Sequence, residues 1–365
     1  MRHSKAGLIA FAVCGLISAA FAGDAAALPV HVTPDDPAIQ LIGRFDKRDK
    51  AGPRCAWPGS SIRVKFTGTQ ANAVLKDTGG ADWVEAIVDG KPGPGFKIDP
   101  AQSVYSICSG LTDGEHTLEI FKRTESNVFN LQLLGIQLEA GKKPLAPPKP
   151  SERRIEIIGD SITCGYGNEG KDQNEHFKPD TENNYLSYGP VAARELNADC
   201  IQIAWSGKKL APDNTIVQLY DLTLPADKTS QWNFSSWIPQ AVVINLGTND
   251  FGHGNPDEKM WTGAYTSFIQ HIRKNYPQAH IFCSVGSMMS DNYPQGQNAL
   301  TTIKGYINKV IADAAAAGDK NVHFLEFTPQ NGPADGLGSD WHPSVKTDQK
   351  MGTKLAEALK KELGW

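Results

Sequence analysis

Cysteine is scarce in this chain, with six residues in 365, and no Cys-x-x-Cys pair or closely spaced Cys/His set is present. A structural zinc site needs such a cluster, so the sequence indicates none. Cys14 lies in the amino-terminal apolar segment described below, which leaves five cysteines, an odd number, in the mature chain. Cys55 with Cys108 is the one disulfide that we favour. The other three lie in or beside predicted core strands, where a thiol packs as a small hydrophobe: Cys164, Cys200 and Cys283.

The chain also lacks a strong charge of either sign. Its formal net charge is −4, and lysine and arginine do not gather into the basic stripe that nucleic acid or an anionic membrane requires. We therefore expect no nucleic-acid partner and no membrane partner. We also expect a monomer. Hydrophobic residues make up 40% of the sequence, which is enough for real cores. A length of 365 residues favours two domains.

No apolar run is long enough to span a bilayer as a mature helix. The run at 8–21 follows the cationic Arg2 and Lys5, and an Ala-Phe-Ala tripeptide at 20–22 has the small-x-small cleavage pattern. Residues 1–23 therefore have the form of a secretory signal peptide. We expect the mature protein to be secreted or periplasmic, where disulfides can form.

Residues 24–140 alternate short apolar segments with turn dipeptides and show no sustained helical period. The dipeptides Asp89-Gly90 and Asp113-Gly114 are hairpin signals. The expected strands are 39–45, 61–67, 73–76, 83–88, 103–108, 116–123 and 129–138. Such spacing predicts an all-β sandwich of jelly-roll type. A domain of this kind either binds carbohydrate or packs against its neighbour, and the fold alone does not decide between them.

A segment rich in proline and lysine at 141–152 is typical of a semi-rigid linker. Over 153–365 strands alternate with amphipathic helices, which predicts an α/β domain with five parallel strands and helices on both faces. The expected strands are 155–159, 201–205, 241–246, 280–285 and 322–327, and the expected helices are 183–196, 257–275, 299–317 and 347–363. A Gly-Pro pair at 189–190 predicts a break or a fresh start in the first helix.

The first strand of this half ends in Gly159-Asp160-Ser161, a sharp turn at the strand's carboxyl end. Open α/β sheets bind ligands at that edge, so Ser161 is a candidate nucleophile. The tripeptide also occurs as an ordinary turn. We expect Asp160 to be a structural acid rather than a catalytic one.

Three further loops after predicted strands carry the other groups that acyl transfer by a serine needs. His342 can act as the base, with Asp340 accepting from its other ring nitrogen. Asn249 can offer a side-chain amide, and Gly207 a backbone N–H, to an oxyanion. Singly, each also fits a plain loop or turn function. Four such segments at four strand ends, in the order Ser, Gly, Asn and Asp-x-His, are hard to explain as coincidence.

These blocks, Gly-Asp-Ser at 159–161, Gly207, Gly-Thr-Asn-Asp at 247–250 and Asp-Trp-His-Pro at 340–343, resemble the SGNH (GDSL) hydrolases. The longer Gly-Asp-Ser-Ile-Thr-Cys-Gly-Tyr-Gly block, Tyr-Leu-Ser-Tyr-Gly at 185–189, Ser-Gly-Lys at 206–208 and the β-sandwich are similar to carbohydrate esterase family 2. The resemblance implies a flavodoxin-like domain that removes O-acetyl groups from plant polysaccharides such as xylan or glucomannan, without metal or organic cofactor.

Carried onto this sequence, the resemblance implies Ser161 as nucleophile, His342 as base and Asp340 as the acid that orients it. The N–H of Ser161, the N–H of Gly207 and the amide of Asn249 would form the oxyanion hole. Some relatives orient the histidine by a backbone carbonyl and lack the acid. Many relatives also have a second glycine where this chain has a lysine, at position 209.

Aromatic residues adjoin these loops and are candidates for stacking on sugar rings, or for ordinary packing. They are Trp341, Trp205 and Tyr166. Two rival functions remain. One is a lipase, thioesterase or lysophospholipase of the same superfamily, against which the chain has no obvious long apolar lid. The other is a carbohydrate-binding protein with an inactive hydrolase domain, against which all four catalytic elements are present.

Overall fold

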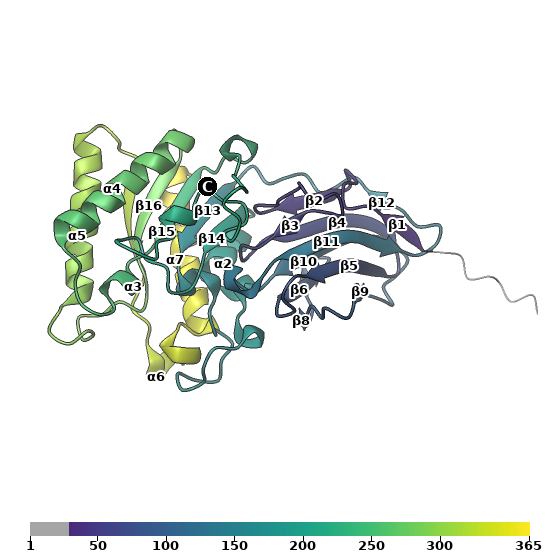
Figure 1. Cartoon of the computed structure of the whole chain (residues 1–365), viewed down its shortest axis with the longest axis horizontal. Helices are drawn as coiled ribbons and strands as arrows, with labels where there is room; N and C mark the ends of the chain where they lie inside the picture. The colour runs from purple at the N-terminus through teal and green to yellow at the C-terminus, as the bar shows by residue number, and fades with distance from the viewer. Residues whose placement is uncertain (1–28) are drawn as a thin grey trace, which may run out of the picture.

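A computed structural model describes residues 29–365, so the expected signal peptide, 1–23, lies outside the described residues. Figure 1 shows a β-rich amino-terminal part beside a carboxyl-terminal part in which helices flank a sheet. This is an all-β domain followed by an α/β domain with a parallel sheet of five strands, as the sequence predicts. Within the described residues, no helix combines the length and the apolarity needed to cross a membrane.

The β domain consists of two antiparallel sheets that enclose one core. One sheet has the order β1-β11-β5-β9, with β3 also on β11; the other has the order β12-β4-β10-β6-β7, with β2 on β4 and β8 on β6. Side chains alternate between core and surface along β4, where Val64 and Phe66 are buried against Leu75 and Leu133 of the facing sheet. The strands are β1 Val30–Val32, β2 Ile39–Ile42, β3 Arg54–Cys55, β4 Ser61–Gly68, β5 Ala71–Asp77, β6 Trp83–Val88, β7 Lys91–Pro92, β8 Phe96–Lys97, β9 Val104–Cys108, β10 Gly114–Lys122, β11 Leu131–Leu138 and β12 Pro144–Leu145.

One of these strands lies in the segment 141–152, which the sequence presents as a linker. β12 pairs with β4, so that Pro144 lies opposite Phe66 and Leu145 opposite Lys65. Proline is acceptable there because it opens a short strand at the sheet edge. The segment therefore belongs in part to the sandwich.

The expected disulfide between Cys55 and Cys108 is wrong, because both are free thiols. Cys55 lies opposite Leu131 of β11, whereas Cys108 lies opposite Ala71 of β5, and Ala71 pairs with Leu138 at the other end of β11. Seven residues of extended strand span roughly 23 Å. A disulfide needs its Cα atoms within about 7 Å.

The second domain contains a parallel five-stranded sheet in the order β14-β13-β15-β16-β17. Helices α2 and α7 cover one face and helices α4 and α5 the other. Ile155 and Ile157 of β13 pack toward α2 and α7, while Ile158 packs in the core under α4. The strands are β13 Arg154–Gly159, β14 Asp199–Ala204, β15 Ala241–Asn245, β16 His280–Val285 and β17 Val322–Glu326. The helices are α1 Ser161–Cys164, α2 Tyr188–Glu195, α3 Thr248–Phe251, α4 Glu258–Asn275, α5 Ala299–Ala316, α6 Gly332–Asp335 and α7 Val345–Leu363.

The helix ends follow from local chemistry. Asp257 caps α4 by accepting from Met260 N over 2.8 Å, and basic residues occupy the last turn of that helix. A fresh start is found at the Gly-Pro pair, because α2 begins at Tyr188 and Pro190 lies in its first turn. Proline is tolerated there because the first-turn N–H groups have no partner within the helix.

The two domains share a buried interface. Trp57 of the β domain is fully buried in the core beside α4, and its Nε1 donates to Leu222 O over 3.2 Å. Arg44 is also fully buried, with Nη2 3.2 Å from Glu156 Oε2 of β13. Burying an ion pair and an indole across a boundary ties both domains into one unit.

Candidate active site

The nucleophile candidate lies at the carboxyl end of β13. Asp160 caps the short helix α1 by accepting from Ile162 N over 3.1 Å, which places the first helical residue, the largely buried Ser161, at the sheet edge. A Cβ at Gly159 would lie 1.9 Å from Thr163 Oγ1, so the tight turn requires glycine. The local sequence thus places the Ser161 hydroxyl where open sheets bind ligands.

His342 meets that hydroxyl from the loop before α7. Its Nε2 lies 2.8 Å from Ser161 Oγ, although 181 positions separate the two residues. Its Nδ1 lies 3.1 Å from the backbone carbonyl oxygens of both Ser339 and Asp340. Two carbonyl acceptors require a proton on Nδ1, which leaves Nε2 as the acceptor for the serine proton. Burial lowers the pKa of His342 below its usual value, while the two carbonyl contacts raise it.

The expected contact between the Asp340 carboxylate and His342 is wrong, because that carboxylate bonds to other groups. It accepts from Tyr166 Oη at 2.9 Å and from Phe177 N at 3.0 Å, and His176 Nδ1 lies 2.8 Å away. The backbone of Asp340 is left-handed, with φ of 49°, and this turns its carbonyl toward the imidazole and its side chain away. Asp340 thus holds the surrounding loop together, and its peptide group orients the histidine.

Tyr166 is part of this loop packing. Its ring lies on the His342 imidazole, with centroids 4.2 Å apart, and on Phe177 at 4.5 Å. The phenol, bonded to Asp340, therefore restrains the imidazole from one side. Burial, followed by the hydrogen bond to Asp340, raises the pKa of Tyr166, so the phenol stays protonated.

The predicted oxyanion donors are joined by one side chain. Asn249 Nδ2 donates to Lys208 O over 3.0 Å and lies 3.4 Å from Asp160 Oδ2. It therefore connects the loop of Gly207 with the turn that carries Ser161. Among residues 29–365, neither the N–H of Ser161 nor that of Gly207 has an acceptor. Gly207 has φ of 76°, a conformation that suits glycine.

Two acids support these loops, the fully buried Asp160 and the half-buried Asp250. Burial raises the pKa of Asp160 to about 7, and its carboxylate caps α1. Asp250 accepts from Leu210 N, Ala211 N and Trp261 Nε1, and so fixes the chain that follows Gly207. As expected, Asp160 makes structural contacts and is not hydrogen-bonded to Ser161 or His342.

The three aromatic candidates differ in accessibility. Trp341 is 60% exposed, and its carbonyl oxygen is held by Gln330 Nε2 at 2.8 Å. Trp205 is half-buried beneath Lys208, whose Nζ lies 4.5 Å from the ring centroid. Tyr166 is occupied by His342 and Phe177. Of the three, Trp341, which precedes His342 in the sequence, is the most exposed.

Sequence reasoning missed one contributor altogether. Glu125 lies after β10 in the β domain, yet its carboxylate accepts from Ser206 N and from Ser206 Oγ, each over 2.6 Å. The signal at this position was misleading, because Lys122, Arg123 and Glu125 form a charged run that resembles a solvated strand end. All three are buried at the domain interface.

Within the part of the chain that the structure describes, one group of side chains has the spacing of metal ligands. Glu125, Cys164 and Glu182 each have a donor atom within 4.8 Å of the others. Glu125 is already engaged by Ser206, and the Lys122 ammonium donates to the Glu125 carbonyl over 3.3 Å. A cation so close opposes a second one, so we assign no metal to this group.

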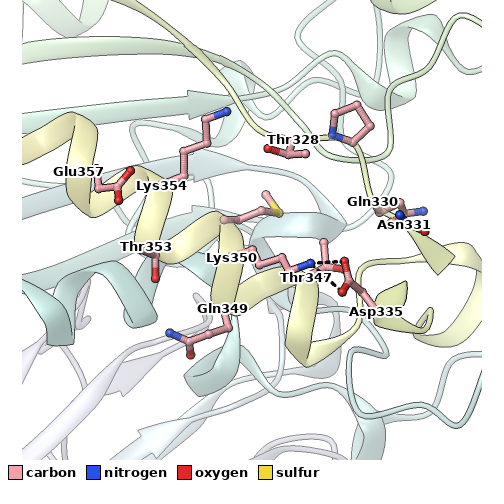
Figure 2. A pocket seen from close by; sticks show the side chains of 12 residues that line it. Thr328, Gln330, Asn331, Asp335, Thr347, Gln349, Lys350, Thr353, Lys354 and Glu357 are labelled. Carbon is pink, nitrogen blue, oxygen red and sulfur yellow. Dashed lines mark hydrogen bonds and ion pairs between the residues drawn. The ribbon is translucent and has the colours of Figure 1, made fainter. Parts of the chain in front are cut away.

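A hollow of about 550 Å³ lies apart from Ser161, Gly207, Asn249 and His342, between the loop after β17 and helix α7. Figure 2 shows Lys350 bonded to Asp335 on one side of it and Glu357 on the helix above. Gln330, which lines it, also holds the Trp341 carbonyl. The hollow thus adjoins the backbone of the exposed tryptophan.

Two family profiles match the chain. The profile described as Carbohydrate esterase 2 N-terminal matches residues 41–148, and that of the GDSL-like Lipase/Acylhydrolase family matches residues 157–350. The first coincides with most of the β domain and the second with most of the α/β domain.

Two curated proteins are similar in sequence. Cellulase/esterase CelE of Acetivibrio thermocellus is 45% identical over 341 residues, which cover 91% of this chain and 41% of that protein. This chain therefore spans less than half of that relative. An acetylxylan esterase / glucomannan deacetylase of Cellvibrio japonicus is 27% identical over 345 residues, which cover 92% of this chain and 91% of that protein.

Two solved structures share the fold over nearly the whole described chain. A family two carbohydrate esterase from Clostridium thermocellum, in complex with cellohexaose, has a TM-score of 0.85 and 44% identity, covering 90% of this chain and 99% of that one. A family two carbohydrate esterase from Cellvibrio japonicus has a TM-score of 0.82 and 26% identity, covering 92% and 98%.

Proposed function

Because the chain belongs to carbohydrate esterase family 2, a family of carboxylic ester hydrolases, we propose that it removes O-acetyl groups from a plant polysaccharide such as xylan or glucomannan. One observation carries the chemistry: Ser161 Oγ lies 2.8 Å from His342 Nε2 at the ligand-binding edge of the sheet. Hydroxyl and base at that separation form the pair that acyl transfer requires.

In the first half of the reaction, Ser161 Oγ attacks the acetyl carbonyl carbon while His342 Nε2 takes the serine proton. The carbonyl oxygen becomes negative and accepts hydrogen bonds from the N–H groups of Ser161 and Gly207. The Asn249 amide can add a third bond, because its present contact with Asp160 is long, at 3.4 Å. His342 then protonates the departing sugar oxygen, and the C–O bond to the sugar breaks, leaving acetyl-Ser161.

In the second half, His342 removes a proton from water, and the resulting hydroxide attacks the acetyl carbon. The same donors hold the new oxyanion. When it collapses, the bond to Ser161 Oγ breaks, His342 returns its proton to the serine, and acetate leaves. Throughout, the carbonyls of Ser339 and Asp340 stabilise the imidazolium, so the mechanism is that of a Ser-His pair oriented by the backbone.

The substrate class rests on family membership and on the exposed Trp341. Sugar rings pack their C–H faces on aromatic rings, and the exposed Trp341 precedes His342 in the sequence. We further propose that the protein acts as a monomer outside the cytoplasm, secreted or periplasmic, because the substrate is a cell-wall polymer and residues 1–23 have the form of a signal peptide.

The test is acetate release from acetylated xylan and acetylated glucomannan, measured beside hydrolysis of a long-chain 4-nitrophenyl ester. We expect release from one or both polymers and little turnover of the long-chain ester. Ser161→Ala should abolish turnover, whereas Ser235→Ala, at an exposed serine, should leave it unchanged. Preference for the long-chain ester would contradict the substrate assignment, and full activity of Ser161→Ala would contradict the mechanism.

A further inference from the structure

Glu125 is a fully buried acid of the β domain whose side chain ends beside the catalytic loops. It follows β10 and contacts residues of the α/β domain on two segments. One is Ser206, directly before Gly207. The other is Cys164, the last residue of the helix that begins with Ser161, whose Sγ lies 3.8 Å from Glu125 Oε2. Burying a carboxylate costs free energy unless hydrogen bonds compensate for the lost water. The partners of Glu125 on these two segments therefore indicate what it does.

The contact with Ser206 fixes one peptide group. Glu125 Oε2 accepts from Ser206 N and Oε1 accepts from Ser206 Oγ, each over 2.6 Å. Two hydrogen bonds thus join the carboxylate to Ser206. Short bonds of this kind to a carboxylate are about twice as strong as neutral ones. The next N–H along the chain is that of Gly207, which points to no acceptor among residues 29–365.

The carbonyl groups of Gly207 and Lys208, which follow Ser206 in the loop, are held by asparagine side chains. Asn214 Nδ2 donates to Gly207 O over 3.1 Å, and Asn249 Nδ2 donates to Lys208 O over 3.0 Å. These bonds hold the carbonyls that follow the Gly207 N–H, while Glu125 holds the residue before it. Glycine at φ of 76° has wide conformational freedom, so its N–H direction depends on such tethers.

Glu125 is itself held through its backbone by residues of both domains. Its backbone N–H donates to Glu182 Oε2 over 3.0 Å, and its carbonyl accepts from Lys122 Nζ at 3.3 Å. That ammonium is anchored in turn by Asp82 Oδ1 at 2.6 Å, and both partners are fully buried. The other Glu182 oxygen, Oε1, has no partner among the described residues. Burial raises the pKa of both acids, and the hydrogen bonds from Ser206 counteract this effect at Glu125.

We propose that Glu125 is a positioning residue of the β domain that aims the Gly207 N–H at the reacting carbonyl by gripping Ser206 across the domain interface. The inference rests on the proposed function, in which Gly207 serves the oxyanion hole. Under this inference the β domain contributes to the geometry of the active site through Glu125. No contact of Glu125 with substrate is required.

The experiment measures kcat and KM on 4-nitrophenyl acetate for the full-length chain. Glu125→Ala should lower kcat about 100-fold, with KM within about threefold, because misdirecting an oxyanion donor weakens mainly the transition state. Ser206→Ala, which loses the hydrogen bond from Ser206 Oγ to Glu125, should lower kcat by about 10-fold. The double variant should be no worse than Glu125→Ala alone, since both changes remove the same tether.

Two further variants separate positioning from general damage. Glu125→Gln has an amide that can accept from Ser206 N and donate to Ser206 Oγ, so it should restore kcat to within about 10-fold of the parent. Glu85→Gln alters another buried acid of the same domain, bonded to Arg123 rather than to a catalytic loop, and should leave kcat unchanged. Near-ultraviolet circular dichroism checks the folding of each variant.

Asn249→Ala separates the two levels of inference. If it lowers kcat while folded Glu125→Ala and Ser206→Ala keep kcat within twofold of the parent, the positioning assignment is overturned and the proposed function stands. If Asn249→Ala and Glu125→Ala both keep full kcat, the oxyanion hole itself is wrong. A large loss in Glu125→Ala with no recovery in Glu125→Gln and a matching loss of folded protein would also overturn positioning.

Discussion

The carbonyl oxygen of Ser339 lies 3.1 Å from Nδ1 of His342, where serine hydrolases of the Ser-His-Asp type have a carboxylate. The Asp340 carbonyl lies at the same distance. Two neutral acceptors fix the tautomer of the imidazole but stabilise its charged form less than a carboxylate would. The His342 imidazole is therefore oriented by the geometry of its own loop.

The first prediction concerns Asp340. We expect Asp340→Asn to lower kcat by at most about 10-fold, because the imidazole keeps its backbone acceptors and only the loop contacts to Tyr166 and Phe177 change. His342→Ala, by contrast, should lose about 10⁴-fold, as expected when the base of such a pair is removed. Steady-state kinetics on 4-nitrophenyl acetate compares them. A loss of 10³-fold or more in Asp340→Asn would show that its carboxylate is needed as the third triad member.

The second prediction concerns pH. Catalysis needs His342 neutral, and burial lowers the pKa of His342 below its ordinary value near 6.5. The neutral base therefore persists to lower pH than it would in a free histidine. We expect the acid limb of a kcat/KM profile to have its midpoint below pH 6.5, measured with an uncharged acetyl ester. A midpoint above 7 would contradict the desolvated environment of the imidazole.

The third prediction concerns Trp341. Replacing it by alanine removes an exposed ring from the residue that precedes His342. We expect KM for acetylated polysaccharide to rise by about 3- to 10-fold, the size of one aromatic contact, with little effect on a small ester that has no sugar. Phe129→Ala, at an exposed aromatic residue of the β domain, is the control. Equal KM values on polymer for the parent and Trp341→Ala would remove this ring from the substrate site.

The fourth prediction concerns stability. Burial raises the pKa of Asp348 to about 8, against a reference value of 3.8. Between pH 4 and 8 the folded state keeps protons that the unfolded state has released, so this contribution to stability falls as pH rises through the folded pKa. We expect the unfolding temperature to be higher at pH 5 than at pH 8.5.

Asp348→Asn isolates one part of that effect. The amide cannot ionise, so the variant should lose less stability than the parent between pH 5 and pH 8.5. Asn168 Nδ2 and the Tyr188 N–H each donate a hydrogen bond to the Asp348 side chain. An asparagine at position 348 can keep one of these two bonds through its amide oxygen. Thermal unfolding at the two pH values gives the comparison. An unchanged difference between the two pH values would mean that Asp348 is ionised in the folded protein.

Much of the architecture follows from periodicity alone. The β-branched run of β13 and the helical spacing of Trp261, Tyr265 and Ile272 in α4 predict buried elements that the structure contains. The short strands β3, β7 and β8 were not predicted, because two-residue strands carry no measurable alternation. They exist through their partners in the sheets rather than through local preference.

Of the candidate site, too, only part could be predicted from the sequence. The juxtaposition of Ser161 with His342 follows from the rule that parallel strands end at one edge, which the sequence order alone supports. The partner of Nδ1 does not follow, because it depends on the left-handed backbone at Asp340 rather than on residue type. The reach of Glu125 to Ser206 is equally invisible in sequence, since it depends on how two domains pack.

The indole of Trp57 lies inside the hydrophobic centre of its neighbouring domain and donates to Leu222. A chimaera that exchanged the β domain between two family members would therefore place the other protein's residue at position 57 in the hydrophobic core of the α/β domain. Recombination at the Pro/Lys-rich segment 141–152 preserves chain connectivity but not this packing. Successful grafts will have to move Trp57 together with the residues around 210–224 that receive it.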